Sequence, residues 1–147
     1  MSRIASPIDV SLCNYMIQRH RDLEQRYCQL LEALAANAPD MRELWNELER
    51  GLLAHMEAEE RFVLPAFARG NLEQAVELLR DHGRIREHLL ELGIAIDLHL
   101  LRYERSADLV ELLRSHGRRE DQLLYQWADK QLDTELAKAA MQHASLR

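Results

Sequence analysis

The chain has 147 residues, enough for one domain with an apolar core, and 47% hydrophobic and 30% charged residues are the balance of a soluble globular protein. The net charge of −6 comes from interleaved acidic and basic residues, so no basic stripe is present to bind nucleic acid. No uncharged apolar run approaches the ~18 residues that span a bilayer, and we expect no membrane partner.

Helix-forming residues dominate, and only 5 Gly and 3 Pro interrupt them, which favours an all-α fold. A first helix is expected to begin at Ser6-Pro7-Ile8-Asp9, with Ser6 as the N-cap, and to end at Asn37-Ala38-Pro39. Apolar residues and one histidine recur at steps of three and four, as in a bundle helix. This inner face carries Cys13, Met16, His20, Leu23, Tyr27, Leu30 and Leu34.

A second helix is expected from near Pro39, and Pro65 should kink its last turn because proline lacks a backbone N–H. Its inner face carries Met41, Leu44, Leu48, Leu52, His55, Glu59, Phe62 and Ala66. Asn71 is expected to cap a third helix, with Leu78, His82, Ile85, Leu89, Leu92, Ile96, His99 and Tyr103 inward. A fourth helix is expected from Ser106, with Leu109, Leu112, His116, Glu120, Leu123 and Trp127 inward.

Short connections between long amphipathic helices predict an antiparallel up-down-up-down four-helix bundle. We expect a single domain over residues 1–147, with its core at about 8–130 and a C-terminal tail or short helix at 131–147. Cys13 and Cys28 fall roughly 22 Å apart on the first helix, beyond disulfide reach. Reduced cysteines and the lack of an apolar signal segment favour a cytoplasmic location.

Each predicted helix places a histidine on its inner face at a similar height, namely His20, His55, His82 and His116. A buried imidazole without a partner is disfavoured, so four of them need a common explanation. Counted from the same end of the bundle, the four lie within roughly 6 Å of one another in height. We therefore expect the four imidazoles to converge on one layer of the core.

Two of these histidines are followed four residues later by a carboxylate, in the pairs His55 with Glu59 and His116 with Glu120. Residues at i and i+4 share a helix face, so each pair presents nitrogen and oxygen to the same point. Imidazole with carboxylate suits iron, zinc or manganese, and two carboxylates can bridge two ions. Without metal, the two buried carboxylates would repel each other. The pattern predicts a site for divalent cations.

Neighbouring residues leave alternatives open. Glu24 lies one turn after the first of these histidines and would be a seventh ligand. Asp121 competes with Glu120 for the bridging role, although the i+4 spacing favours Glu120. His99 falls on the inner face but roughly 25 Å from His82, so we expect it to be a core or inter-helix hydrogen-bonding residue.

The chain resembles the hemerythrin-like (HHE cation-binding) domain family in the order of its motif residues: His20, His55 and Glu59, His82, His116 and Glu120. The segments 55–65 and 81–86 are similar to the family's second-helix and third-helix motifs. The likeness covers about residues 8 to 130 and implies a four-helix bundle around a non-haem di-iron centre.

The resemblance also implies a role for each ligand. His20 and His55 would bind one iron ion. His82 and His116 would bind the other, with the two glutamates bridging. Oxygen-carrying hemerythrins have a second histidine four residues after the third-helix ligand, and Arg86 stands at that position here. Open metal positions would then favour redox turnover over reversible oxygenation, with Arg86 either extended to solvent or paired with a bridging carboxylate.

We therefore expect a di-iron protein that binds, senses or turns over a small oxidant, namely oxygen, peroxide or nitric oxide. Peroxide decomposition is the enzymatic activity that the sequence allows, and reversible oxygen carriage fits less well. The alternatives are an iron-handling or iron-responsive regulatory protein without catalysis, and a structural bundle without stoichiometric metal. Zinc or manganese is the alternative to iron. We expect a monomer or homodimer whose partner is the small oxidant.

Overall fold

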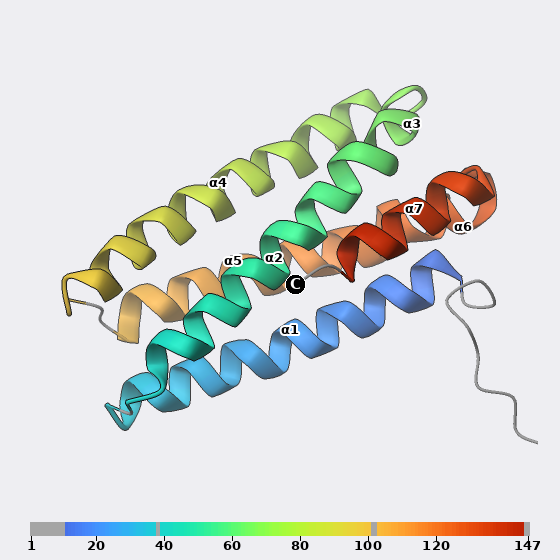
Figure 1. Cartoon of the computed structure of the whole chain (residues 1–147). Helices are drawn as coiled ribbons and strands as arrows, with labels where there is room; N and C mark the ends of the chain where they lie inside the picture. Colours follow the sequence, from blue (N-terminus) through green and yellow to red (C-terminus); the bar gives the residue numbers. More distant parts are fainter. Residues whose placement is uncertain (1–10, 38, 101–102, 146–147) are drawn as a thin grey trace, which may run out of the picture.

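The computed structural model describes residues 11–37, 39–100 and 103–145 (Figure 1). This described part of the chain is all-helical and holds no strand. The elements are α1 (Leu12–Ala35), α2 (Met41–Phe62), α3 (Leu64–Ala68), α4 (Leu72–Asp97), α5 (Tyr103–Arg119), the π-helix η1 (Glu120–Leu124), α6 (Tyr125–Gln131) and α7 (Thr134–Ala144). The all-helical prediction is confirmed. Residues 131–147, for which the sequence left a tail or a short helix open, contain the helix α7.

The helix ends follow local capping chemistry. The predicted start at residues 6–9 lies outside the described residues, and within them α1 begins after Ser11, whose Oγ accepts a hydrogen bond from the backbone N–H of Asn14. Asn37, two residues after the end of α1, has a φ of 51°, a left-handed conformation that asparagine tolerates well. The predicted start of the fourth helix at Ser106 is wrong, because α5 begins at Tyr103 and Ser106 is buried one turn inside it.

Proline interrupts the second predicted helix as expected. The α2 helix ends at Phe62, and Val63 separates it from the short helix α3. Pro65 lies in the first turn of α3, where its missing N–H breaks no helical hydrogen bond. The chain therefore turns at the end of α2 and then enters α4.

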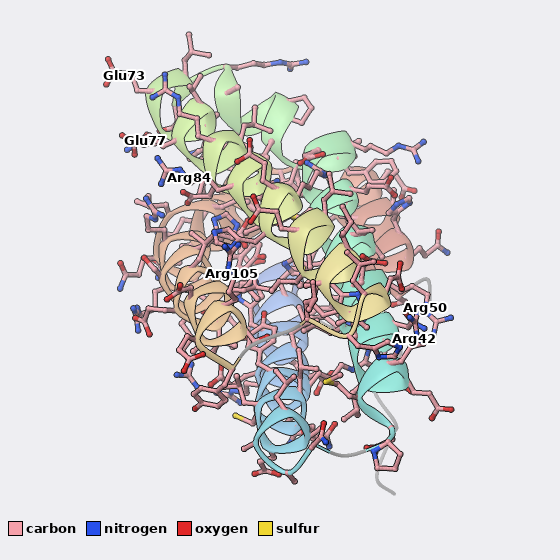
Figure 2. All side chains as sticks on the ribbon, turned by 90° about the vertical axis from the view of Figure 1, so that its left-hand side faces the viewer. Arg42, Arg50, Glu73, Glu77, Arg84 and Arg105 are labelled. Atoms are coloured by element: carbon pink, nitrogen blue, oxygen red, sulfur yellow. The ribbon has the colours of Figure 1, made fainter. Side chains whose placement is uncertain are left out.

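The long helices pack side by side. The α1 helix contacts α2 and α5, and α4 contacts α5 and α2, while α7 folds back onto α2 and α1 (Figure 1). Figure 2 shows labelled charged side chains such as Arg42, Glu77 and Arg84 projecting away from the helices, and all three are exposed. The polar faces thus point to solvent, and the apolar faces meet between the helices.

Two apolar clusters fill the interior, separated by a polar layer. One cluster includes Met16, Leu78, Phe67 and Leu124, and the other includes Leu23, Leu52, Ile85 and Leu113. On each of the long helices the predicted histidine lies where one cluster gives way to the other, as His20 does between Met16 and Leu23. The fold therefore brings the histidines to the same depth.

Both cysteines are free and half-buried, as the spacing of Cys13 and Cys28 predicts. Among the helices that the structure describes, none has the length and apolar character needed to cross a membrane.

Candidate metal centre

The structure brings all six predicted side chains into the polar layer. His20 comes from α1, His55 and Glu59 from α2, His82 from α4, His116 from α5 and Glu120 from the first position of η1. The side chain of His20 is 17% exposed, and the other five are buried. The residues that sequence spacing selected thus meet in space.

One half of the layer is built around His20 and His55. The Nε2 atoms of these two imidazoles lie 3.0 Å apart. Glu120 Oε1 lies 3.3 Å from His20 Nε2, and Glu59 Oε1 lies 3.4 Å from His55 Nε2. Nitrogen and oxygen atoms from three helical segments therefore converge on one point.

The other half is built around His82 and His116. Glu120 Oε2 lies 3.3 Å from His82 Nε2 and 2.9 Å from His116 Nε2. Glu59 Oε1 lies 3.5 Å from His82 Nε2. Each of the two carboxylates therefore faces both pairs of imidazoles, as bridging groups do.

The donor atoms fall into two groups compact enough to hold a cation each. One contains Glu59, His82, His116 and Glu120, and the other contains His20, His55 and Glu120, with the ligand atoms of each group within 4.8 Å of one another. Glu59 Oε1 and His116 Nε2 are buried and make no hydrogen bond of good geometry, although His116 Nε2 lies 2.9 Å from Glu120 Oε2. Leaving such atoms unpaired costs about 1–3 kcal/mol each, and a bound cation would satisfy them. The residues fit a divalent metal.

Protons occupy the metal-free cluster in place of cations. Burial acts to lower the pKa of each imidazole, but neighbouring carboxylates outweigh it at three of them. Hydrogen bonds to Asp121 and Glu120 raise the pKa of His20 to about 10. Hydrogen bonds to Glu120, Glu59 and Glu60 raise that of His82 to about 12. These cationic imidazoles neutralise the buried carboxylates.

In the remaining ionisable groups of the cluster, burial and neighbouring charges also determine the direction of each pKa shift. At His116 the charge of Glu120 outweighs burial and raises the pKa to about 9, which is a smaller rise than at His82. Burial, followed by the charge of Glu120, raises the pKa of Glu59 to about 8. Despite burial, His116 and its neighbours hold the pKa of Glu120 well below its usual range. His55, which has the weakest carboxylate contacts, is kept neutral by burial with a pKa of about 4.

A ring of outer carboxylates, which the sequence reasoning did not identify, orients three of the imidazoles. His82 Nδ1 hydrogen-bonds Glu60 at 2.6 Å, and His116 Nδ1 hydrogen-bonds Asp81 at 2.9 Å. Asp121 Oδ1 lies 3.0 Å from His20 Nδ1. Each outer carboxylate directs the Nε2 atom of its histidine inward, as the carboxylate partners of metal-binding histidines do.

The sequence held a signal for this ring. Each outer carboxylate is adjacent in sequence to a predicted ligand: Glu60 follows Glu59, Asp81 precedes His82, and Asp121 follows Glu120. One residue along a helix is a rotation of about 100°, which turns the side chain toward the next helix of the bundle. An acidic residue beside a ligand is therefore placed to reach the neighbouring helix's histidine.

The structure shows where the residues that the sequence analysis left open lie. Arg86 makes two hydrogen bonds to Glu60, of 2.7 and 2.8 Å, so the alternative in which it pairs with a bridging carboxylate is wrong. Glu24 is paired with Arg114 at 2.8 Å and belongs to neither group of metal-binding atoms. Asp121 contacts the outer nitrogen of an imidazole, which leaves the inner position to Glu120.

Tyr125 is the central residue that the sequence reasoning missed. Its hydroxyl lies 2.9 Å from His55 Nε2, 3.1 Å from His20 Nε2 and 2.8 Å from Glu59 Oε2. The prediction expected Leu123 inward, but Leu123 is 39% exposed and Tyr125 is buried. The cause is η1, where the backbone N–H of Tyr125 bonds the carbonyl of Glu120, five residues back, and shifts the register.

The remaining predicted core histidine is not in the core. His99 is exposed and lies beyond the end of α4, with a φ of 56°. The α4 helix ends at Asp97, so the inner face that the heptad spacing extended to His99 does not exist there. The expectation that His99 is a core residue is therefore wrong.

A cavity of about 240 Å³ reaches the layer from the side of α1 and α5. Apolar side chains such as Leu23, Leu52 and Ile85 line its interior, and the cavity ends against His20 and His116. The Glu24–Arg114 ion pair also lines it, with both side chains about 40% exposed, so this pair lies at the solvent side. A small molecule therefore has an apolar chamber beside the candidate metal centre.

Comparison with known proteins agrees with this geometry. A family model described as Hemerythrin HHE cation binding domain matches residues 12–128, from the start of α1 into α6. No curated protein and no solved structure gives a significant match.

Proposed function

The chain belongs to the hemerythrin HHE cation-binding domain family, and from this premise we propose that it is a non-haem di-iron protein that binds, senses or turns over a small oxidant. The observation that carries the proposal is the position of Glu59 and Glu120 between two pairs of imidazoles. Two shared carboxylates and four imidazoles form a donor set that suits a pair of iron ions.

The proposed fold is the antiparallel four-helix bundle of this family. In this interpretation α2 and α3 form its second helix, interrupted before Pro65, and α5, η1 and α6 form its fourth. The contacts of α1 with α2 and α5, and of α4 with the same two helices, support this arrangement (Figure 1). The α7 helix is then an addition that covers α2 and α1.

His20 and His55 would hold one ion, and His82 and His116 the other, with Glu59 and Glu120 shared between them. Bound iron supplies electron transfer and Lewis acidity to a small oxidant. The chain supplies the orientation of the imidazoles through Glu60, Asp81 and Asp121. Arg86 holds Glu60, and Arg119 holds Asp81 at 2.6 Å, so the outer carboxylates are themselves fixed in place.

The apolar cavity supports an oxidant of a few atoms as the ligand. Oxygen and nitric oxide are small and weakly polar, and the buried Leu23, Leu52 and Ile85 would favour their entry over that of ions. Peroxide is polar but small enough for the same space. The ion pair of Glu24 and Arg114 neutralises two of the charges at the solvent side, where Arg118 also lines the cavity.

Metal content tests the centre directly. The purified protein, reconstituted with ferrous iron without oxygen and desalted, should retain two iron ions per chain by elemental analysis. Glu120→Gln should lose both, because this carboxylate faces both groups, and His116→Asn should lose at least one. His99→Asn is the matched control and should keep both, because His99 is exposed and remote. Wild-type protein without iron would refute the proposal.

Reaction with oxidant tests the function. Addition of peroxide to iron-loaded protein should change its visible absorption and consume peroxide, measured together with dissolved oxygen. Zinc-loaded protein is the control, because zinc has no redox chemistry and should do neither. Iron-loaded protein that reacts with neither peroxide, oxygen nor nitric oxide would contradict oxidant handling and leave the centre itself in place.

A second candidate is an iron-responsive regulatory protein without catalysis. The observation that favours it is the origin of the six side chains on α1, α2, α4, α5 and η1, since metal binding would tie these helices together. This function predicts a large thermal stabilisation by iron with no consumption of peroxide. The two readouts measured on one sample therefore separate the candidates.

A further inference from the structure

Tyr125 lies among the proposed ligands rather than beside them. Its hydroxyl oxygen is within 3.2 Å of an atom of four of the six: His20, His55, Glu59 and Glu120. The contacts to His20, His55 and Glu120 are to the nitrogen and oxygen atoms that also contact one another, and the contact to Glu59 is to its second oxygen, Oε2. A core tyrosine that needed only one hydrogen-bond partner would have been satisfied by Glu59 alone.

The spacing of these atoms is that of ligands on one ion. His20 Nε2, His55 Nε2 and Tyr125 Oη form a nearly equilateral triangle with sides of 3.0, 2.9 and 3.1 Å. An octahedral ion with bonds of about 2.1 Å separates adjacent ligands by roughly 3.0 Å. The triangle therefore has the dimensions of one face of an octahedron, and the carboxylate oxygen Glu120 Oε1 lies 3.2 Å from Tyr125 Oη beside that face.

The local backbone explains how Tyr125 reaches this position. The hydrogen bond from its N–H to the carbonyl of Glu120 closes a π-turn, so residues 120 and 125 lie on the same side of the helix. In a regular α-helix, residues five apart are separated by about 140° around the axis. The π-turn thus adds a second donor to the segment that already carries Glu120, and π-turns recur at functional sites.

We propose that Tyr125 is a seventh protein ligand, binding as a phenolate to the ion held by His20 and His55. This inference rests on the proposed metal centre. In the metal-free protein the phenol donates its hydrogen to Glu59 Oε2 at 2.8 Å. On binding, the phenolic O–H bond breaks, the proton leaves to solvent, and the oxygen takes its place on the ion. Within the described residues no tyrosine hydroxyl bonds His82 or His116, so the two ions would have unequal protein donor sets.

The first test is spectroscopic. A phenolate on ferric iron gives a visible charge-transfer band and enhanced tyrosine ring vibrations in the resonance Raman spectrum. Ferric wild-type protein should show both, and Tyr125→Phe should lose both while elemental analysis reports its iron content. Tyr27→Phe is the matched control, because Tyr27 is also buried and lines the cavity but is not among the contacts of the cluster. It should retain both signals.

A second variant removes dependence on the folding of Tyr125→Phe. The chain has four tyrosines, and Tyr15→Phe/Tyr27→Phe/Tyr103→Phe leaves Tyr125 as the only one. Zinc added to this triple variant should produce the ultraviolet difference spectrum of a tyrosinate. Two bound ions without the tyrosinate and charge-transfer signals would overturn the inference and leave the proposed centre intact. Wild-type protein that binds no metal would overturn both.

Discussion

At the scale of single residues, the outer carboxylates decide how firmly each imidazole is aimed. His82 and His116 each have a hydrogen-bonded carboxylate on Nδ1, and His20 has Asp121 3.0 Å away. Among the described residues no carboxylate pairs with His55 Nδ1, which is buried without a hydrogen-bond partner, so this imidazole is held by packing and by its contacts at Nε2. The outer contact of His82 with Glu60, at 2.6 Å, is the shortest of the three. The affinity for the ion that His82 would bind should therefore depend most strongly on Glu60.

Glu60→Gln should weaken metal binding at that ion by roughly tenfold or more, within the 10–100-fold range typical of such partners. Its carboxylate contacts His82 Nδ1 and Arg86, which lower its pKa to about 2 despite burial, so the native group is an anion near neutral pH. The neutral amide removes that charge while keeping the shape. Competition with a chromophoric chelator measures the affinity.

Glu57→Gln is the matched control for this prediction. Glu57 lies on the same helix, and its carboxylate pairs with His143 of α7 at 2.9 Å, away from the centre. Metal affinity should stay at the wild-type value. Equal losses in the two variants would show that a general loss of negative charge, and not the orientation of His82, sets the affinity.

At the scale of the helical elements, η1 is the feature that most changes the site. It lets Glu120 face inward at its first residue and then adds one residue to the turn, so that Leu124, Tyr125 and Ala128 become the buried positions. A π-turn is stable only when tertiary contacts compensate for its poorer geometry. The hydrogen bonds of Tyr125 and the apolar contacts of Leu124 supply that compensation here.

Deletion of Gln122 should be tolerated. Gln122 is exposed within the π-turn, and its removal changes the spacing of Glu120 and Tyr125 from five to four residues, which still places both on one face of a regular helix. The melting temperature should stay within a few degrees of wild type, and metal should still bind. Circular dichroism melting and elemental analysis measure the two outcomes.

Deletion of Gln126 is the matched control, because this glutamine is equally exposed but follows the π-turn. Its loss would rotate Trp127 and Ala128 by about 100° relative to Tyr125 and remove Trp127 from its contact with Phe67. The variant should be destabilised by several kcal/mol, as other disrupted cores are. If the two deletions destabilise the protein equally, the interpretation of η1 as one extra residue inserted into an otherwise regular α-helix is wrong.

The same element explains how far the sequence predicts this protein. The periodicity of three and four residues locates the helices and brings the six side chains together, because i and i+4 positions share a face and four helices have a common depth. A π-turn leaves no mark on that periodicity, so Tyr125 was missed and Leu123 was placed inward. The outer carboxylates depend on which helix lies beside which, and that information comes from tertiary packing.

At the scale of the whole molecule, the centre is the polar layer between two apolar clusters. Each cluster draws on α1, α2 and α4, so the layer is enclosed by packing from both ends. The buried charges of the layer oppose folding unless they are paired. Protons on His20, His82 and His116 pair them in the metal-free protein, and cations would pair them in the loaded one. The same fold is therefore stabilised by different species in the two states.

This difference predicts opposite pH dependence. The raised pKa values of His20, His82 and His116, about 10, 12 and 9, mean that the metal-free folded state holds protons that the unfolded chain releases above about pH 6.5. Their stabilising contribution is complete below that pH and is lost as the pH rises through the folded values. Glu59, with a pKa of about 8, acts in the same direction. The chelator-treated protein should thus melt at a lower temperature near pH 9 than near pH 6.

The metal-loaded protein should show the reverse between about pH 6 and 7.5. Its imidazoles bind metal and no protons, whereas the unfolded chain takes up protons below about pH 6.5, so stability rises with pH. Zinc is the appropriate ion for this measurement because it does not change oxidation state. Thermal melts of zinc-loaded and chelator-treated samples in the same buffers compare the slopes. If the melting temperatures of the two samples changed with pH in the same way, protons and metal would not compete for these imidazoles. That result would contradict a metal centre built from them.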